Sequence, residues 1–260
     1  MLEKLKTALW FLRNPPFWAQ AIELVRRKLT DADRHEACRP EARRWAAGQA
    51  VSAREALERA GIYQPSSGPF PQLPEALVDE ATRRANSAQV AMGGPGDLGL
   101  LYAAVALTKP RAVIETGVAY GWSSLAILAA METGGRLISV DMPYAKMNNE
   151  PWVGIAVPDA LKTNWTLIRE PDRNGLAKAI RAAGGAIDLC HYDSDKSYPG
   201  RQYAYPRLWK ALRPGGLFIS DDIQDNFAFR DFCAENRLDF QVTESAGKYV
   251  GLVRKPPAKA

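Results

Sequence analysis

Short apolar runs alternate with longer amphipathic segments along residues 98–254. The runs are three to six residues long, which fits strands that are buried on both faces. We expect strands at 112–114, 137–140, 166–168, 187–192 and 217–220. We expect helices between them at 98–107, 123–132, 176–183 and 203–212. This alternation predicts a parallel sheet that is covered by helices on both sides.

Two further apolar segments, 240–243 and 249–253, flank the sequence Ser245-Ala246-Gly247. A short connection with glycine between two strand-like runs is typical of a β-hairpin. We therefore expect a Rossmann-like α/β sheet that ends in an antiparallel hairpin, unlike the sheet of ordinary dinucleotide-binding dehydrogenases.

The N-terminal region has apolar residues at helical spacing instead. We expect helices at 2–12, 17–29, 42–60 and 77–91. Pro15-Pro16 interrupts the first pattern, and the segment 62–74 is rich in Pro, Ser and Gly, which is typical of a linker. The chain is therefore expected to have two parts, a helical extension with its linker over 1–75 and an α/β domain over 76–260.

The composition is ordinary for a globular protein, with 47% hydrophobic and 24% charged residues. The formal net charge is +5, and basic residues gather early, as in Arg26-Arg27-Lys28 and Arg43-Arg44. A basic helical extension can contact nucleic acid or anionic lipid. The alternative, which we favour from the sequence alone, is that these residues form the solvated faces of amphipathic helices.

The spacing of the cysteines and the length of the apolar segments indicate the cellular location of the protein. Cys38, Cys190 and Cys233 have no C-x-x-C spacing, so neither a disulfide framework nor a zinc site is expected. The early apolar run at 8–12 is shorter than the core of a secretory signal, and no stretch approaches the length of a membrane span. We expect a cytoplasmic protein without a transmembrane segment.

A glycine-containing turn follows the first predicted strand of the α/β domain. Gly117 and Gly121 allow the chain to turn tightly and a ligand to approach the backbone. The second strand ends at Asp141, twenty residues after Gly121, where a carboxylate can accept hydrogen bonds from both ribose hydroxyls of a nucleoside. The G-x-x-x-G spacing differs from G-x-G-x-x-G, which argues against NAD.

This turn, with Glu115 before it, resembles the E-x-G-x-x-x-G-x-S cofactor loop of the catechol O-methyltransferase-like class I methyltransferases. In that family the loop holds the methionine part of S-adenosylmethionine. The resemblance implies that Gly117 and Gly121 shape the cofactor pocket, that Ser123 meets the carboxylate and that Asp141 meets the ribose. It implies cofactor contacts at Glu115, Gly117, Gly121, Ser123 and Asp141.

Carboxylates follow two other predicted strands. Asp193 comes after the strand 187–192, and Asp221 and Asp222 come after the strand 217–220. If these strands are neighbours, the three carboxylates converge at one rim, where they repel one another unless they are protonated or bridged by a cation. Oxygen ligands favour a hard divalent ion such as Mg²⁺.

Such an ion can bind a substrate hydroxyl, lower its pKa and hold its oxygen in line with a methyl sulfonium. Lys196 is a candidate for the base, provided that the metal and partial burial depress its pKa. His191 is a second candidate. A plain surface lysine and a core histidine remain alternatives, and Asp195 is expected to face solvent or to pair locally.

The sequence Asp193-Ser194-Asp195-Lys196 resembles the D-x-D-K stretch of caffeoyl-coenzyme A and related O-methyltransferases. Plant members have Asp-Asn after the next strand, and Asp221-Asp222 is more similar to the macrocin-type sugar O-methyltransferases. The segment 212–216 is similar to the L-x-P-G-G turn of class I methyltransferases. The resemblance covers about 90–254 and does not reach the first 60 residues.

Three further positions are weaker cofactor candidates. In related O-methyltransferases the stretch that corresponds to Met92 and Gly93 folds over the cofactor, and a simple interdomain turn is the alternative. Asp172 follows the third strand, where this class contacts adenine.

The sequence therefore predicts an S-adenosylmethionine- and Mg²⁺-dependent O-methyltransferase that acts on a small hydroxylated molecule, such as a sugar moiety, a polyketide-type compound or a phenol. The N-terminal helices are expected to cover the site or to form a homodimer. A non-catalytic cofactor-binding protein that docks a partner through these helices is the alternative. A nucleic-acid methyltransferase is disfavoured, because no N/D-P-P-Y/F motif follows the strand 187–192.

Overall fold

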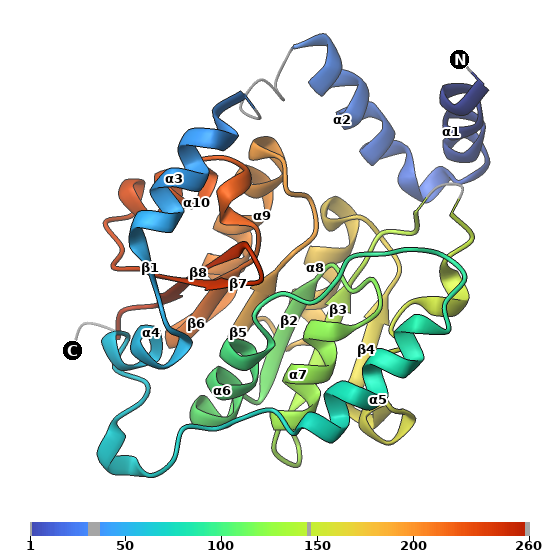
Figure 1. Ribbon diagram of the computed structural model, residues 1–260. Coiled ribbons are helices and arrows are strands. Elements are labelled where there is room, and N and C mark those ends of the chain that lie inside the picture. Colours follow the sequence, from blue (N-terminus) through green and yellow to red (C-terminus); the bar gives the residue numbers. More distant parts are fainter. Residues whose placement is uncertain (1, 31–36, 145–146, 258–260) are drawn as a thin grey trace.

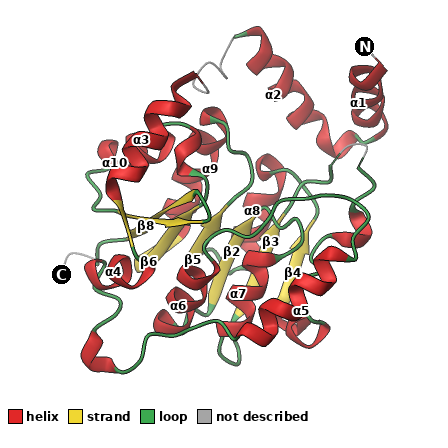
Figure 2. Ribbon diagram, in the orientation of Figure 1, coloured by secondary structure: helices red, strands yellow, loops and turns green. Residues whose placement is uncertain are grey.

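The computed structural model describes residues 2–30, 37–144 and 147–257, with an eight-stranded sheet between two layers of helices (Figures 1 and 2). The sheet order is β4-β3-β2-β5-β6-β8-β7-β1, and β8 alone among these strands runs antiparallel to its neighbours. The strands are β1 (Ala50–Val51), β2 (Ala112–Thr116), β3 (Arg136–Val140), β4 (Trp165–Ile168), β5 (Ile187–Tyr192), β6 (Leu212–Ser220), β7 (Gln241–Ser245) and β8 (Lys248–Arg254). The predicted parallel sheet with a C-terminal hairpin is confirmed.

The hairpin between β7 and β8 has a two-residue turn. Ala246 and Gly247 both have positive φ, at 50° and 77°. Two left-handed residues in a row are the geometry of a type I′ turn, whose twist matches that of the flanking strands. The turn lets β8 insert between β6 and β7 as the antiparallel strand.

The helices divide into two layers and an N-terminal pair. The layer with α3 (Arg39–Gln49), α8 (Asp172–Ala182), α9 (Tyr198–Ala211) and α10 (Ala228–Glu235) packs on one face of the sheet. The other layer contains α4 (Ala53–Arg59), α5 (Glu75–Asn86), α6 (Leu98–Thr108) and α7 (Trp122–Ala130). Strands that are buried on both faces explain why their sequences are apolar throughout rather than alternating.

The predicted helix over 42–60 is interrupted. Ala50 and Val51 are extended and pair with Val242 and Thr243 as β1, and Ser52 then begins α4 by accepting a hydrogen bond from the Glu55 N–H. A helical composition is overridden here by pairing with a strand that is distant in the sequence. Part of the expected extension over 1–75 is therefore built into the sheet and both helical layers.

The helices α1 (Leu2–Arg13) and α2 (Trp18–Leu29) lie at one end of the molecule, apart from the two layers (Figure 1). The 3₁₀ turn Pro15–Phe17 separates them, as the proline pair predicts. Of the helices that the structure describes, none has the length and apolar character needed to cross a bilayer.

Candidate active site

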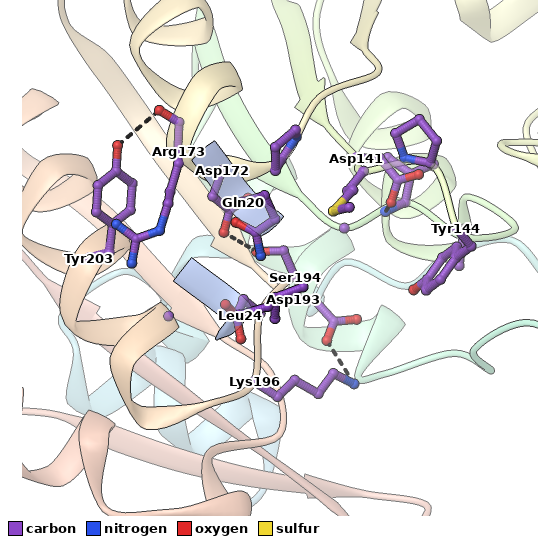
Figure 3. Close-up of a pocket in the computed structure, with 18 of the residues that line it drawn as sticks. Gln20, Leu24, Asp141, Tyr144, Asp172, Arg173, Asp193, Ser194, Lys196 and Tyr203 are labelled. Atoms are coloured by element: carbon purple, nitrogen blue, oxygen red, sulfur yellow. Dashed lines mark hydrogen bonds and ion pairs between the residues drawn. The ribbon is translucent and has the colours of Figure 1, made fainter. Parts of the chain in front are cut away.

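A cavity of about 380 Å³ lies at the carboxyl ends of the central strands. Gly117 follows β2, Asp141 follows β3 and Asp193 follows β5, and all three line it. Figure 3 shows Asp141 and Asp193 in this cavity. This is the edge at which open α/β sheets bind their ligands, and the volume is in the range of small-molecule pockets. Phe11 of α1 and Leu24 of α2 cover it, which agrees with the expectation that the N-terminal helices lie over the site.

The glycines of the turn after β2 are required by the space around them. Gly117 has φ +80°, and a Cβ there would lie 2.3 Å from the carbonyl oxygen of Asp193. Gly121 has φ +89°, and a Cβ there would lie 2.9 Å from Gly154 Cα. Gly117 lines the cavity, whereas Gly121 begins α7 beneath the loop that contains Gly154.

Asp141 is fixed from two sides. Its Oδ1 accepts a hydrogen bond from the Val118 N–H at 2.9 Å, and its Oδ2 is paired with Arg169. Arg169 also pairs with Glu150 at 2.7 Å. Burial raises the pKa of Asp141 above its usual value in spite of these partners. Arg169 was not predicted as a site residue, although a cation directly after β4 is a sequence signal for such a contact.

Asp172 lies at the N-terminus of α8 and also lines the cavity. The Ser194 hydroxyl donates a hydrogen bond to its Oδ2 at 2.5 Å. Burial raises the pKa of Asp172 to about 6. A carboxylate with few partners at a buried helix start is a suitable acceptor for a polar ligand.

The acidic residues after β5 and β6 are held by basic side chains. Lys196 Nζ lies 3.2 Å from Asp193 Oδ1 and pairs with Asp222 Oδ2 (Figure 3 shows the first pair). Asp221 is turned toward His191, whose Nε2 lies 3.2 Å from Asp221 Oδ1. In the described part of the chain, no three acidic, histidine or cysteine side chains lie close enough to hold a metal ion.

Residues 114–223 match the family model for a methyltransferase domain. The chain carries a methyltransferase domain. This match and the fold confirm the predicted class of enzyme. No curated protein matches the chain.

Solved structures with the same fold include other methyltransferases. A putative O-methyltransferase from Klebsiella pneumoniae has a TM-score of 0.56 at 18% identity, over 72% of this chain and 92% of that chain. The O-methyltransferase from Bacillus cereus in complex with SAH has a TM-score of 0.52 at 18% identity, over 73% and 94%. A methyltransferase from Geobacter sulfurreducens has a TM-score of 0.53 at 16% identity, over 79% and 98%. At these identities the likeness shows the class I fold.

The charge state of Lys196 in the methyltransferase domain differs from the one that a base requires. Its role as a base was conditional on a pKa depressed by a metal and by partial burial, whereas in this structure the neighbouring carboxylates of Asp193 and Asp222 outweigh the effect of burial and raise the pKa of Lys196. In this arrangement the side chain is an ammonium and a hydrogen-bond donor. It has no lone pair with which to accept a proton.

His191 and Glu115 lie inside the methyltransferase domain and do not line its cavity. They are opposite each other on β5 and β2, and both are fully buried. Burial lowers the pKa of His191, but the carboxylates of Asp221 and Glu115 outweigh this effect and raise it to about 10. The ring is therefore an imidazolium near neutral pH, which corrects its assignment as a base that reaches the substrate.

Glu115 is corrected in the same way as a direct cofactor contact. Its Oε2 accepts hydrogen bonds from the hydroxyls of Ser124 and Ser139, both at 2.6 Å, and its Oε1 lies 3.8 Å from His191 Nδ1. The acid of the E-x-G motif thus joins β2 to α7 and β3 within the methyltransferase domain. It therefore stabilises the glycine turn that follows β2.

The remaining candidates occupy different places around the methyltransferase cavity. Gly93 lines it, whereas Met92 donates its N–H to the Tyr120 hydroxyl at 3.1 Å. Ser123 is the second residue of α7 and is not among the residues that line the cavity.

Two residues that line the cavity, Asp195 and Tyr203, make tertiary contacts that were not predicted from the sequence. Asp195 accepts a hydrogen bond from the Ser197 hydroxyl at 2.7 Å, which is the local pairing that was expected, and its other oxygen pairs with Arg27 of α2 at 2.7 Å, across 168 positions of sequence. Tyr203 of α9 lines the cavity and donates a hydrogen bond to the Arg173 carbonyl at 3.1 Å. Neither tertiary contact has a local sequence signal, because each partner belongs to another element.

Proposed function

We propose that this methyltransferase transfers the methyl group of S-adenosylmethionine to a hydroxyl oxygen of a small molecule, with the help of a divalent cation. One observation carries the proposal. The glycine turn with Asp141 and Asp172 lines the same cavity as Asp193 and Lys196. Residues suited to a nucleoside and a charged group suited to an acceptor hydroxyl therefore line one cavity.

Two carboxylates are suited to the nucleoside part of the cofactor. Asp141, at the end of β3, has the position that accepts hydrogen bonds from ribose hydroxyls. Asp172, at the start of α8, is suited to the exocyclic amine of the base. Gly117 leaves room for the methionine part beside the backbone. The Bacillus cereus O-methyltransferase of the same fold is a complex with SAH, which supports this choice of cofactor.

As they lie among the described residues, the carboxylates after β5 and β6 do not form a metal site, because Lys196 pairs with Asp193 and Asp222 while Asp221 is turned toward His191. Asp193 Oδ1 is buried and accepts no hydrogen bond among the described residues, and Lys196 supplies the positive charge beside it. Burial and the Asp221 charge raise the pKa of Asp193 to about 7, because the positive charges nearby do not fully compensate for them. To hold an ion, Asp193 and Asp222 would have to release Lys196, and Asp221 would have to turn away from His191. The ion, when bound, would acidify the acceptor hydroxyl.

Lys196 is the base in this proposal. Its raised pKa depends on the pairs with Asp193 and Asp222, so the pKa falls when other positive charge neutralises these carboxylates. Once the Lys196 ammonium has released a proton to solvent, the free amine would accept the hydroxyl proton, the oxygen would form a bond to the methyl carbon, and the sulfur would keep the electrons of the broken C–S bond. The products are the methyl ether and S-adenosylhomocysteine.

Calorimetry with S-adenosylhomocysteine tests the cofactor, and turnover of a panel of sugars, polyketides and phenols with labelled S-adenosylmethionine tests the reaction. We expect turnover to require a divalent ion and to be lost in Asp221→Ala. Undiminished turnover in chelator would contradict the metal. Tight binding without turnover of any acceptor would favour the non-catalytic alternative.

A further inference from the structure

The exposed large apolar side chains are concentrated in the N-terminal helix pair. Among the described residues, α1 and α2 contain all of those that are exposed apart from Tyr144. They are Leu9, Leu12, Trp18, Ile22, Leu24, Val25 and Leu29, and Leu29 is 81% exposed. Such a concentration on one small part of a surface is typical of an interaction site.

The helix α2 has its apolar face outside and part of its charged face inside. Trp18, Ile22, Val25 and Leu29 recur at helical spacing and are exposed. Glu23 and Arg27 lie on the buried side, where Glu23 pairs with Arg173 at 3.0 Å. Because the ion pairs already attach α2 to the domain, its exposed stripe is free to contact something else.

A groove of about 640 Å³ between the two helices deepens this surface. Its walls include Leu12, Trp18, Ile22 and Val25, and they are mainly apolar. Phe11 and Leu24 line both this groove and the active-site cavity. The apolar surface is therefore separated from the cavity by the thickness of single side chains.

Basic residues flank the apolar stripe. Arg13, Arg26 and Lys28 are exposed, whereas the acid Glu23 is buried against arginines. Helices with one apolar face, a tryptophan and flanking Lys or Arg are typical of segments that lie in the interface of an anionic membrane. A symmetric contact between two copies would instead bring the same basic residues of both chains together.

We propose that α1 and α2 form a basic amphipathic hairpin that docks this protein on an anionic lipid surface. The apolar stripe lies at the level of the acyl chains, and Arg13, Arg26 and Lys28 contact the headgroups. Docking places Phe11 and Leu24, which cover the active-site cavity, next to the membrane. The proposal does not depend on the proposed reaction, because lipid binding is measured without turnover.

Flotation of the full-length protein with vesicles tests the proposal. We expect binding to phosphatidylcholine vesicles that contain about one third phosphatidylglycerol, and a loss of binding with pure phosphatidylcholine or at about 0.5 M salt. The variant Arg13→Gln/Lys28→Gln should bind roughly thirtyfold more weakly, since each cation contributes about a factor of five. Ile22→Ser/Val25→Ser/Leu29→Ser should bind at least about tenfold more weakly.

Arg83→Gln/Lys210→Gln is the matched control, because it removes the same charge from exposed positions on α5 and α9. Its binding should stay within about twofold of the original protein. Brominated lipids should quench tryptophan emission, and Trp18→Phe should remove a part of that quenching.

Failure of the original protein to float with the anionic vesicles would overturn the proposal. So would equal binding by the charge variant and its control. A concentration-dependent dimer that the apolar triple variant abolishes, without vesicle binding, would assign the surface to a second copy and contradict the lipid.

Discussion

The turn after β2 and the acidic residues after β5 and β6 lie on the same edge of the sheet, but different forces fix their geometry. In the turn, the backbone itself occupies the space, and a Cβ on Gly117 would lie 2.3 Å from a carbonyl oxygen. After β5 and β6, charges are arranged by pairing, with Lys196 between Asp193 and Asp222 and His191 against Asp221.

This difference separates what the two regions contribute to a reaction. A sterically fixed turn presents the same surface whether or not a ligand is bound. A region held by ion pairs changes its protonation and its contacts when another charge enters. Substitutions in the turn should therefore affect cofactor binding and folding, whereas substitutions of the acidic residues should affect turnover and the pH dependence.

The largest effect is expected for Gly117→Ala. The new Cβ overlaps the Asp193 carbonyl, and the left-handed φ adds strain, so we expect a loss of about 3–5 kcal/mol in unfolding free energy. Cofactor affinity should fall at least about 100-fold, because the turn must move. Gly215→Ala is the control. It has φ +81° with no atom within 4 Å, and should cost about 1 kcal/mol without changing affinity.

His191→Gln should destabilise the protein by about 3–5 kcal/mol, because Glu115 and Asp221 lose the buried cation between them. The pKa of His191 is about 10 in the folded protein against 6.5 as its ordinary value, so its contribution is complete below pH 6.5 and disappears as the pH rises through 10. Chemical denaturation from pH 6 to 10 should show this decline in the original protein. A variant that declines in parallel would contradict the imidazolium.

Asp141→Asn should weaken cofactor binding by about 10- to 100-fold, which is the usual range for a charged hydrogen-bond acceptor. Calorimetry with S-adenosylhomocysteine measures the change. Asp159→Asn is a matched control, because the side chain of Asp159 is 85% exposed and pairs only locally with Lys162. Equal affinities of the two variants would remove Asp141 from the cofactor site.

The sequence predicted the parts of the fold that depend on local pattern. The strand β5 has the predicted bounds, and the glycine turn was found because its conformation excludes other residues at Gly117. The helix α10 was not predicted, and the break before Ser52 was not seen, since β1 exists only through its pairing with β7.

The site was harder to predict than the fold. The strand positions placed Asp193 at the expected rim, but the orientation of Asp221 depends on His191, thirty positions away. The pKa of Lys196 likewise depends on Asp222, which belongs to another strand end. A sequence motif gives the residue types at a site, whereas their charge states come from tertiary neighbours.

The smallest effect is expected for Asp172→Asn. Burial raises the pKa of Asp172 from 3.8 to about 6, so the folded state favours the neutral acid, and stability falls as the pH rises from 3.8 to about 6 and stays at the lower level above it. The neutral amide should therefore stabilise the protein by about 1–2 kcal/mol at pH 8 and have little effect at pH 4. Thermal unfolding at both pH values measures this, and a destabilised variant at pH 8 would disagree with the burial of this charge.

The glycine-turn side of the site is expected to bind the cofactor, and the acidic residues after β5 and β6 are expected to support turnover. These separate roles are tested most directly by measuring S-adenosylhomocysteine affinity and methyl transfer for Asp222→Asn and Asp141→Asn side by side. We predict that Asp222→Asn keeps its affinity within about twofold while turnover falls at least about 100-fold, and that Asp141→Asn loses affinity first. Equal losses of affinity in both variants, or full turnover in Asp222→Asn, would contradict the account.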